Sequence, residues 1–139
     1  MRWIWGDIFT MEVPSNWEVH DRGEVIEIVP PNPVGAAHIS VLKRTENGLV
    51  QPGEASRLAS EFARKQGVKA SAEGETSHGA EGVSRIPFTT TDSGTLLFWV
   101  VVVRVWPARA LICSFCHGGN QAAERLALEM FSSIEPVEA

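Results

Sequence analysis

The chain has 139 residues, with 17 acidic and 12 basic side chains and a formal net charge of -5. This length corresponds to one domain. Its 44% apolar and 21% charged residues are typical of a globular protein that buries a core without disulfides or a structural metal. Collagen-like, coiled-coil and wholly disordered chains are therefore excluded. The basic residues are scattered, whereas phosphate recognition needs clustered Lys and Arg, so we expect no nucleic-acid partner.

The N-terminal sequence and the cysteine content favour a cytoplasmic location. Residues 1–7 (MRWIWGD) lack the apolar core and the small-residue cleavage site of a secretory signal peptide. The longest apolar run, over 96–103, is far shorter than the ~20 residues of a membrane-spanning helix, so we expect no membrane span. Cys113 and Cys116 are the only cysteines, which is no disulfide framework and fits a reducing compartment.

Alternating apolar and polar residues predict four strands in the first third of the chain. They cover residues 8–13, 17–20, 25–29 and 37–42. Short turn-forming segments separate the first three, which predicts an antiparallel meander. The proline-rich segment 30–35 is predicted to be a loop, because proline has no amide donor for a sheet interior.

A first helix is predicted to follow the turn at Asn47-Gly48. Pro52 suits its first turn, Glu54 complements the helix dipole near its start, and Gly67 suits the left-handed position after its end. Its apolar residues recur at helical spacing: Ala55, Leu58, Ala59, Phe62 and Ala63. The segment 70–82, rich in Ser, Gly and Glu, is interpreted as a weak strand with a mobile connection.

The last part of the chain predicts a long hairpin, one more strand and a final helix. Strands over 84–90 and 96–103 flank a turn at 92–94, and the second is apolar without alternation, so it needs cover on both faces. A strand over 111–115 ends at two glycines. Asn120 is then predicted to cap a helix that ends by Pro136, with this buried stripe: Ala123, Leu126, Ala127, Met130 and Ile134.

These elements predict a single α+β domain over 1–139. We expect a mostly antiparallel sheet of about seven strands with helices packed on both faces, because a strand that is apolar on both sides must be covered on both sides.

The opening Phe9-Thr10-Met11-Glu12-Val13-Pro14 followed by Trp17, the late hairpins and a terminal helix closing on Ser132-Ser133-Ile134 resemble the Mog/PsbP-like fold. This group includes photosystem II extrinsic subunits, a Ran-binding nuclear import factor and small bacterial proteins, some of them secretion-effector chaperones. The resemblance spans most of the chain and implies a non-catalytic accessory or binding role. It carries over no functional residue, because the shared positions are structural.

The segment Cys113-Ser114-Phe115-Cys116-His117 matches the attachment motif of c-type haem. A strand places Cys113 and Cys116 on opposite faces, so the two thiols cannot both bond to one haem. In addition, c-type haem attachment belongs to an exported compartment. The same argument weakens a redox pair, which needs its thiols at a helix start. We therefore predict that the two cysteines form no disulfide with each other and that Cys113 is a small core residue.

No metal, cofactor or catalytic site is predicted. The four histidines, His20, His38, His78 and His117, have no ligand-like spacing. No Gly-x-Ser-x-Gly elbow is present for a nucleophilic serine. The turn His117-Gly118-Gly119-Asn120 could offer free amides to an anion, but it lacks the lysine of a phosphate loop, so a structural turn is the better interpretation.

Five tryptophans remain to be explained. Trp17 and Trp99 lie in strand patterns and are expected in the core, with Trp99 fully buried. Trp3, Trp5 and Trp106 lie near element ends and are the candidate partner-binding residues, because tryptophan combines a large apolar area with one donor. Edge packing under the final helix is the alternative for these three.

The leading function hypothesis is a non-enzymatic cytoplasmic accessory protein that binds another protein, with a secretion-effector chaperone as a specific form. A homodimer is an open alternative for the partner. The rival hypothesis is a small-ligand protein or enzyme that uses a pocket on the sheet face. A deep cleft with convergent polar groups would favour the rival, and a shallow apolar surface would favour partner binding.

Overall fold

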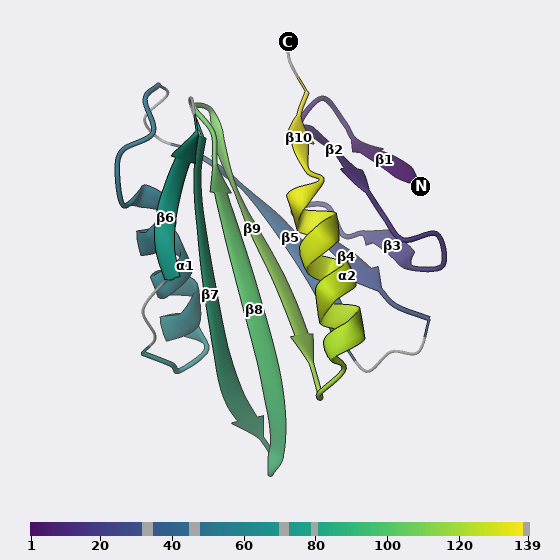
Figure 1. Cartoon of the computed structure of the whole chain (residues 1–139). Coiled ribbons are helices and arrows are strands. Elements are labelled where there is room, and N and C mark those ends of the chain that lie inside the picture. The colour runs from purple at the N-terminus through teal and green to yellow at the C-terminus, as the bar shows by residue number, and fades with distance from the viewer. Residues whose placement is uncertain (32–34, 45–47, 70–72, 79–80, 138–139) are drawn as a thin grey trace.

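The computed structural model describes residues 1–31, 35–44, 48–69, 73–78 and 81–137, with the backbone alone over 73–78 (Figure 1). Within these residues the chain forms strands and two helices, in the order β1 (Arg2–Trp5), β2 (Phe9–Glu12), β3 (Glu18–Asp21), β4 (Val25–Val29), β5 (Gly35–Lys43), α1 (Glu54–Lys65), β6 (Glu73–His78), β7 (Glu81–Asp92), β8 (Thr95–Val105), β9 (Arg109–His117), α2 (Gln121–Ser132) and β10 (Glu135–Pro136).

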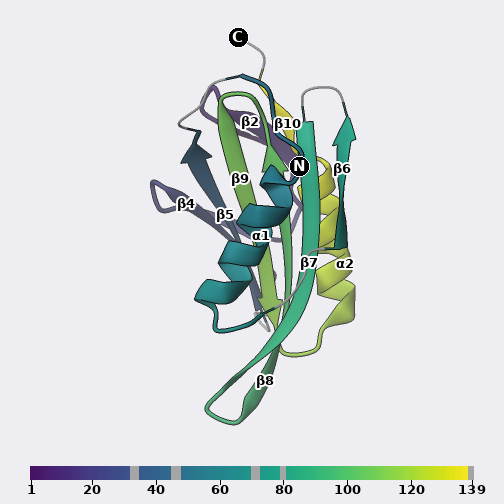
Figure 2. The ribbon, with the colours of Figure 1, turned by 90° about the vertical axis from the view of Figure 1, so that its left-hand side faces the viewer.

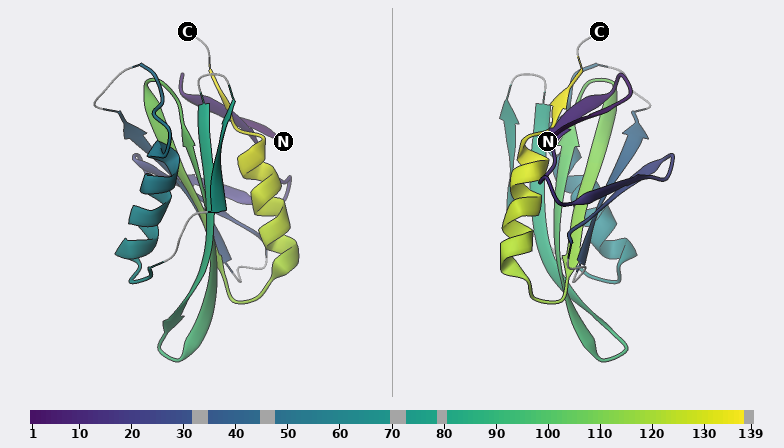
Figure 3. Two further views of the ribbon diagram at one scale, coloured as in Figure 1. Left: turned by 60° about the vertical axis from the view of Figure 1, so that its left-hand side comes forward. Right: turned by 90° about the vertical axis from the view of Figure 1, so that its right-hand side faces the viewer.

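The strands form two antiparallel sheets. The main sheet has seven strands in the order β3-β4-β5-β9-β8-β7-β6, and a small sheet has three in the order β1-β2-β10. Helix α2 and the small sheet lie on one face of the main sheet, and α1 lies on the other (Figures 2 and 3). The predicted α+β class, with helices on both faces of a mostly antiparallel sheet, is confirmed.

Strand β8 is covered on both faces, as its unbroken apolar sequence predicted. Val100 belongs to the core under α2 and the small sheet. Val101 and Val103, which point the other way, belong to the core under α1. Trp99 is only half-buried, so the expectation of full burial is wrong. Its ring lies near the end of α1, beside Phe62 and Phe88.

Helix α1 has the predicted apolar face and the predicted end. Ala55, Ala59 and Ala63 are fully buried, and Gly67 takes the left-handed conformation with φ 84°. Pro52 precedes the helix instead of forming its first turn.

Helix α2 begins as predicted and ends earlier than predicted. The Asn120 side chain accepts a hydrogen bond from the amide of Ala123 at 3.0 Å. The helix ends at Ser132, so Ile134 is buried beyond it. Leu126, expected in the buried stripe, is 40% exposed, because the helix turns its Ala123–Ala127 line toward the sheet.

The predicted meander of the first three strands is wrong. Strand β2 pairs with β1 and β10, whereas β3 pairs with β4. A turn in which the Trp17 amide donates to the Pro14 carbonyl at 3.0 Å separates β2 from β3, so the chain changes sheets there. No strand was predicted over 2–5, because a four-residue strand gives little periodicity before its partners are known.

Several predicted connections can be compared only in part. The hairpin turn at 92–94 is confirmed, with Asp92 paired to Thr95 and Ser93 and Gly94 at φ 49° and 81°. Strand β6 occupies the middle of the segment 70–82, whose residues 70–72 and 79–80 lie outside the described residues. Residues 32–34 of the predicted loop and Asn47 of the predicted turn also lie outside them. Neither described helix has the length and apolarity needed to cross a membrane.

Candidate functional site

Helix α1 covers only part of its face of the main sheet. It packs on β6, β7 and β8, and the strands β3, β4 and β5 on the same side carry no helix (Figure 2). We call this uncovered part the open face. Its side chains, none of them buried, are Glu18, His20, Val25, Glu27, Val29, Ala36, His38, Ser40 and Leu42.

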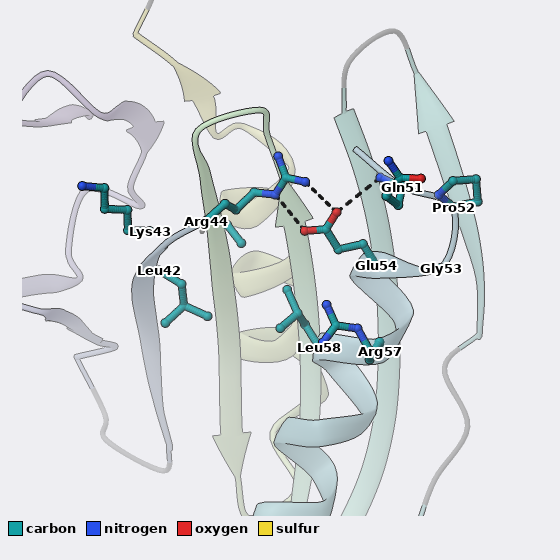
Figure 4. A pocket seen from close by; sticks show the side chains of 10 residues that line it. Leu42, Lys43, Arg44, Gln51, Pro52, Gly53, Glu54, Arg57 and Leu58 are labelled. Carbon is teal, nitrogen blue, oxygen red and sulfur yellow. Dashed lines mark hydrogen bonds and ion pairs between the residues drawn. The ribbon is translucent and has the colours of Figure 1, made fainter. Parts of the chain in front are cut away.

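A cleft of about 530 Å³ lies where the open face meets the start of α1 (Figure 4). It is lined by the end of β5, the segment before α1 and Ala110 of β9. Its apolar lining includes Leu42, which is 39% exposed, and Leu58 of α1. We take this cleft, which we call the α1 cleft, as the candidate site.

Arg44 and Glu54 form the charged wall of the α1 cleft. Arg44 Nε and Nη2 donate to the two carboxylate oxygens of Glu54 at 2.7 and 2.8 Å, and the two side chains are only 7% and 13% exposed. Hydrogen bonding from Arg44 lowers the pKa of Glu54 below its ordinary value of 4.5. Arg44 Nη1 also donates to the carbonyls of Trp106 and Pro107. The pair therefore joins the start of α1 to the turn between β8 and β9.

This use of Arg44 and Glu54 limits what the α1 cleft can do chemically. A bidentate pair holds both groups ionised and occupies their donors and acceptors. The lining also includes two exposed cations, Lys43 and Arg57, and Arg57 Nη1 lies 3.5 Å from Glu61 Oε1. The described lining includes neither Ser, Cys nor His, and Glu54 is held by Arg44, so the lining offers no nucleophile paired with a base.

A row of polar side chains crosses the open face. The register places His20 opposite Glu27 and Glu27 opposite His38. Glu27 accepts one hydrogen bond, from Arg22 Nη2 at 3.3 Å, and pairs with His38 Nε2 at 3.2 Å. Hydrogen bonding from Arg22, and then from His38, lowers the pKa of Glu27. Among the residues that the structure describes, no three His, Cys, Asp or Glu side chains are grouped to hold a metal ion.

A second cleft, of about 370 Å³, lies on the opposite face of the molecule between β2 and α2. Val13 and Met130 line it and are 2% exposed, whereas Leu126 is 40% exposed. Glu12 and Glu129 also line this cleft, and Glu12 forms an ion pair with Arg2 at 3.3 Å. This cleft is smaller than the α1 cleft and also presents an apolar surface.

The glycine turn after β9 is occupied by its own chain. Gly119 donates its amide to His117 Nδ1 at 3.0 Å, and His117 Nε2 lies 2.9 Å from Glu124 Oε1. Since Nδ1 accepts, Nε2 is the donor to the carboxylate. His117 is buried between Phe98 and Phe115. These contacts support the structural interpretation of the turn over an anion site.

The two cysteines lie in β9 on opposite faces of the main sheet, and both are free thiols in the structure. Cys113 belongs to the core under α2, and burial raises its pKa to about 12. Cys116 is half-buried, and burial raises its pKa as well. Thiols with raised pKa values carry little thiolate at neutral pH, so the structure gives no support to a nucleophilic or redox pair.

The three candidate partner-binding tryptophans lie in different surroundings. Trp3 and Trp5 are half-buried in β1, with ring centroids 6.4 Å apart, and both contact Phe9. Trp106 is 7% exposed and lies in the core, so it offers almost no surface to a partner. Its ring lies under the Arg104 guanidinium, 5.8 Å from the ring centroid. For Trp106 the structure agrees with the edge-packing alternative.

Arg44, Arg57 and the open face were missed as site features by the sequence reasoning. Glu54 was noted only for the helix dipole. No local pattern joins Arg44 to Glu54, because residues ten apart meet only after β5 and α1 pack on the same sheet. The alternation of β4 and β5 shows which side chains share a face, but it does not show which face α1 leaves open.

No protein-family model matches the chain, and no curated protein matches it in sequence. Solved structures do match it in fold. The Ran-binding protein Mog1p of Saccharomyces cerevisiae matches over 94% of this chain and 90% of its own, with a TM-score of 0.63 and 12% identity. LpqN of Mycobacterium tuberculosis, described as involved in cell envelope biogenesis, matches over 94% and 83%, with a TM-score of 0.62 and 13% identity.

A protein of Bacteroides thetaiotaomicron VPI-5482 matches over 94% of this chain with a TM-score of 0.62 and 19% identity. This chain spans only 45% of that protein's length. Identities this low establish the shared fold and no shared activity. The chain therefore has the Mog1p/PsbP-like α+β fold.

Proposed function

We propose that the chain is a non-catalytic accessory domain that binds another protein on the open face beside α1. The observation that carries this proposal is the α1 cleft, which joins exposed Leu42 and half-buried Leu58 to a charged pair that is already satisfied. An apolar surface with a rim of polar groups is the usual composition of a protein interface. A cytoplasmic secretion-effector chaperone is the specific form that we propose.

The arrangement of the open face supports a partner of extended area. From the α1 cleft it continues across β5 and β4, where Val25, Val29 and Ala36 alternate with Glu27 and His38. Interfaces of this kind combine apolar contact with charged groups that set orientation. Mog1p, which shares the fold, is described as a Ran-binding protein, and this analogy gives the proposal additional support without naming the partner.

The test compares two leucines of nearly equal exposure on opposite sides of the molecule. Leu42 in the α1 cleft is 39% exposed, and Leu126 in the cleft beside α2 is 40% exposed. We expect affinity capture at native expression to recover a stoichiometric partner, and Leu42→Glu to abolish recovery while Leu126→Glu preserves it. Recovery of no stoichiometric partner with the unchanged protein would contradict the proposed function. Loss with Leu126→Glu alone would move the interface to the cleft beside α2.

A small-ligand protein is the second candidate, and the size of the α1 cleft favours it. Its volume of about 530 Å³ lies within the range of about 300–1,000 Å³ that ligand sites occupy. Screening by thermal unfolding separates the two candidates, because a ligand that binds the folded chain stabilises it by an amount that rises with the logarithm of the ligand concentration over the dissociation constant. A metabolite that raises the unfolding temperature of the unchanged protein but not of Leu42→Glu would favour the ligand.

A further inference from the structure

The β7–β8 hairpin extends beyond the rest of the main sheet. Strand β9 pairs with β8 only as far as Phe98, and among the described residues β6 pairs with β7 only from Glu81 to Arg85. The part of the hairpin beyond Thr89 and Phe98 projects from one end of the molecule (Figures 1 and 3). We call residues 86–97 the arm. Its strands pair with each other, so β7 in the arm has an outer edge with no neighbouring strand among the described residues.

The hairpin register determines which main-chain groups point out from this edge. Asp92 pairs with Thr95 around a two-residue turn, which makes them a hydrogen-bonded pair, and such pairs recur at every second residue. Residues 90, 88 and 86 therefore bond to β8. Thr89 and Thr91 direct both N–H and C=O outward, and Pro87 directs only its C=O outward. Pro87 thus costs the ladder no hydrogen bond, which agrees with this assignment.

The outward groups are complementary to a second copy of the same edge. When two edges run antiparallel about a two-fold axis, Thr89 lies opposite the partner's Thr91. Each of these two threonines then donates and accepts one main-chain hydrogen bond, which gives four bonds across the axis. Thr89, Thr91 and Pro87 are exposed and uncharged, so no like charges meet at the centre. Beyond Thr89 in the direction of β6, Pro87 has no N–H to extend the ladder.

We propose that two copies of the chain associate through this edge, with β7 of the arm pairing antiparallel to β7 of the partner. The ladder covers few residues and buries less area than a stable dimer needs, so we expect a dissociation constant on the order of 100 micromolar. This association is independent of the proposed function, since the arm lies at the opposite end of β8 from Ala110 and the start of α1.

Sedimentation over a range of concentrations tests the association, with three variants of the arm. Thr89→Pro removes the outward N–H and leaves the β7–β8 bonds in place, and we expect it to weaken dimerisation at least about tenfold because two of the four bonds are lost. Thr91→Pro is expected to have the same effect. Thr89→Val is the matched control, because it keeps the N–H and the β-branched shape, and it should dimerise like the unchanged protein.

Amide hydrogen exchange gives a readout that needs no substitution. We expect the amides of Thr89 and Thr91 to become protected as concentration rises, while those of Phe88 and Thr90, which bond to β8, do not change. A chain that stays monomeric to about ten times the expected dissociation constant, on the order of 1 millimolar, would overturn the proposal. Dimerisation that the folded Thr89→Pro and Thr91→Pro variants retain would overturn it too, because the interface would then lie elsewhere.

Discussion

The two faces of the main sheet are covered in different ways. On one face, α2 and the small sheet enclose a core that includes Phe115 and Phe131, both fully buried. On the other, only alanines of α1 are fully buried, and the helix packs mainly on β6, β7 and β8. Large buried side chains contribute most of the hydrophobic stabilisation, whereas small ones allow close approach over a limited area. The first face therefore carries most of the stability, and the second leaves side chains of β3, β4 and β5 unburied.

The largest expected effect compares one phenylalanine from each face. Phe115→Ala removes a fully buried ring and is expected to lower the free energy of unfolding by about 3–5 kcal/mol. Phe62→Ala, on α1, removes a half-buried ring beside Trp99 and is expected to cost about half as much. Denaturant unfolding measures both. Equal costs would show that the two faces contribute alike, against the comparison above.

Unfolding of tryptophan variants tests the same comparison at the edge of the face that α2 and the small sheet cover. Trp106→Ala should cost about 3–5 kcal/mol, because its ring is buried in the core, and Trp3→Ala should cost less, because its ring is half-buried. This order replaces the one expected from sequence, in which Trp99 was the core residue and Trp106 lay at the edge. Unfolding of the Trp3, Trp99 and Trp106 variants side by side checks it. A Trp99 variant that loses as much as the Trp106 variant would contradict the new order.

Overpacking under α1 tests whether that helix approaches the sheet closely. Ala59→Leu adds a large side chain at a position with no exposed area, and we expect it to lower stability by about 1–3 kcal/mol. Leu126→Ala on α2 is a control for a change of similar size at an exposed position, where we expect an effect below about 1 kcal/mol. An Ala59→Leu protein as stable as the original would mean that the helix–sheet contact is loose.

The reactivity of the two cysteines also distinguishes the two faces of the main sheet. We expect a thiol reagent to modify Cys116, on the face that α1 covers in part, first. Cys113 should react only as fast as the chain unfolds, because its side chain has no exposed area, and burial also raises its pKa to about 12. Cys113→Ser and Cys116→Ser assign the two phases of the reaction. Rapid modification of Cys113 in the folded protein would contradict its placement in the covered core.

The smallest expected effect is the pH dependence of the Arg44–Glu54 pair. The pKa of Glu54 is lowered in the folded state, so the pair stabilises the fold above about pH 4.5, and this contribution is lost as the pH falls through the folded-state value. The stability difference between the unchanged protein and Glu54→Gln should therefore be constant near neutral pH and shrink below pH 4.5. Glu61→Gln, farther along α1 with a partly exposed side chain, is the control. A difference that grows on acidification would contradict the assignment.

Local patterns were sufficient to predict most of the elements. The helical spacing from Ala55 to Ala63, the cap at Asn120 and the turn at Ser93-Gly94 depend on neighbours in the chain, so their physics is visible in a short window. The unbroken apolar sequence of β8 also predicted cover on both faces. Successive side chains of a strand point to opposite faces of the sheet, so apolar residues at every position need cover on both faces.

Only the tertiary structure decided which elements meet. The small sheet joins β2 to β10, more than 120 residues away along the chain, through pairs such as Thr10 with Glu135, and no local pattern encodes that contact. The exposure of Leu126 and the Arg44–Glu54 pair likewise depend on how a helix is placed on its sheet. The sequence by itself therefore determined the class of fold, the end of α1 and the start of α2. The open face and its cleft arise from packing between distant segments, because burial is a property of the assembled layers.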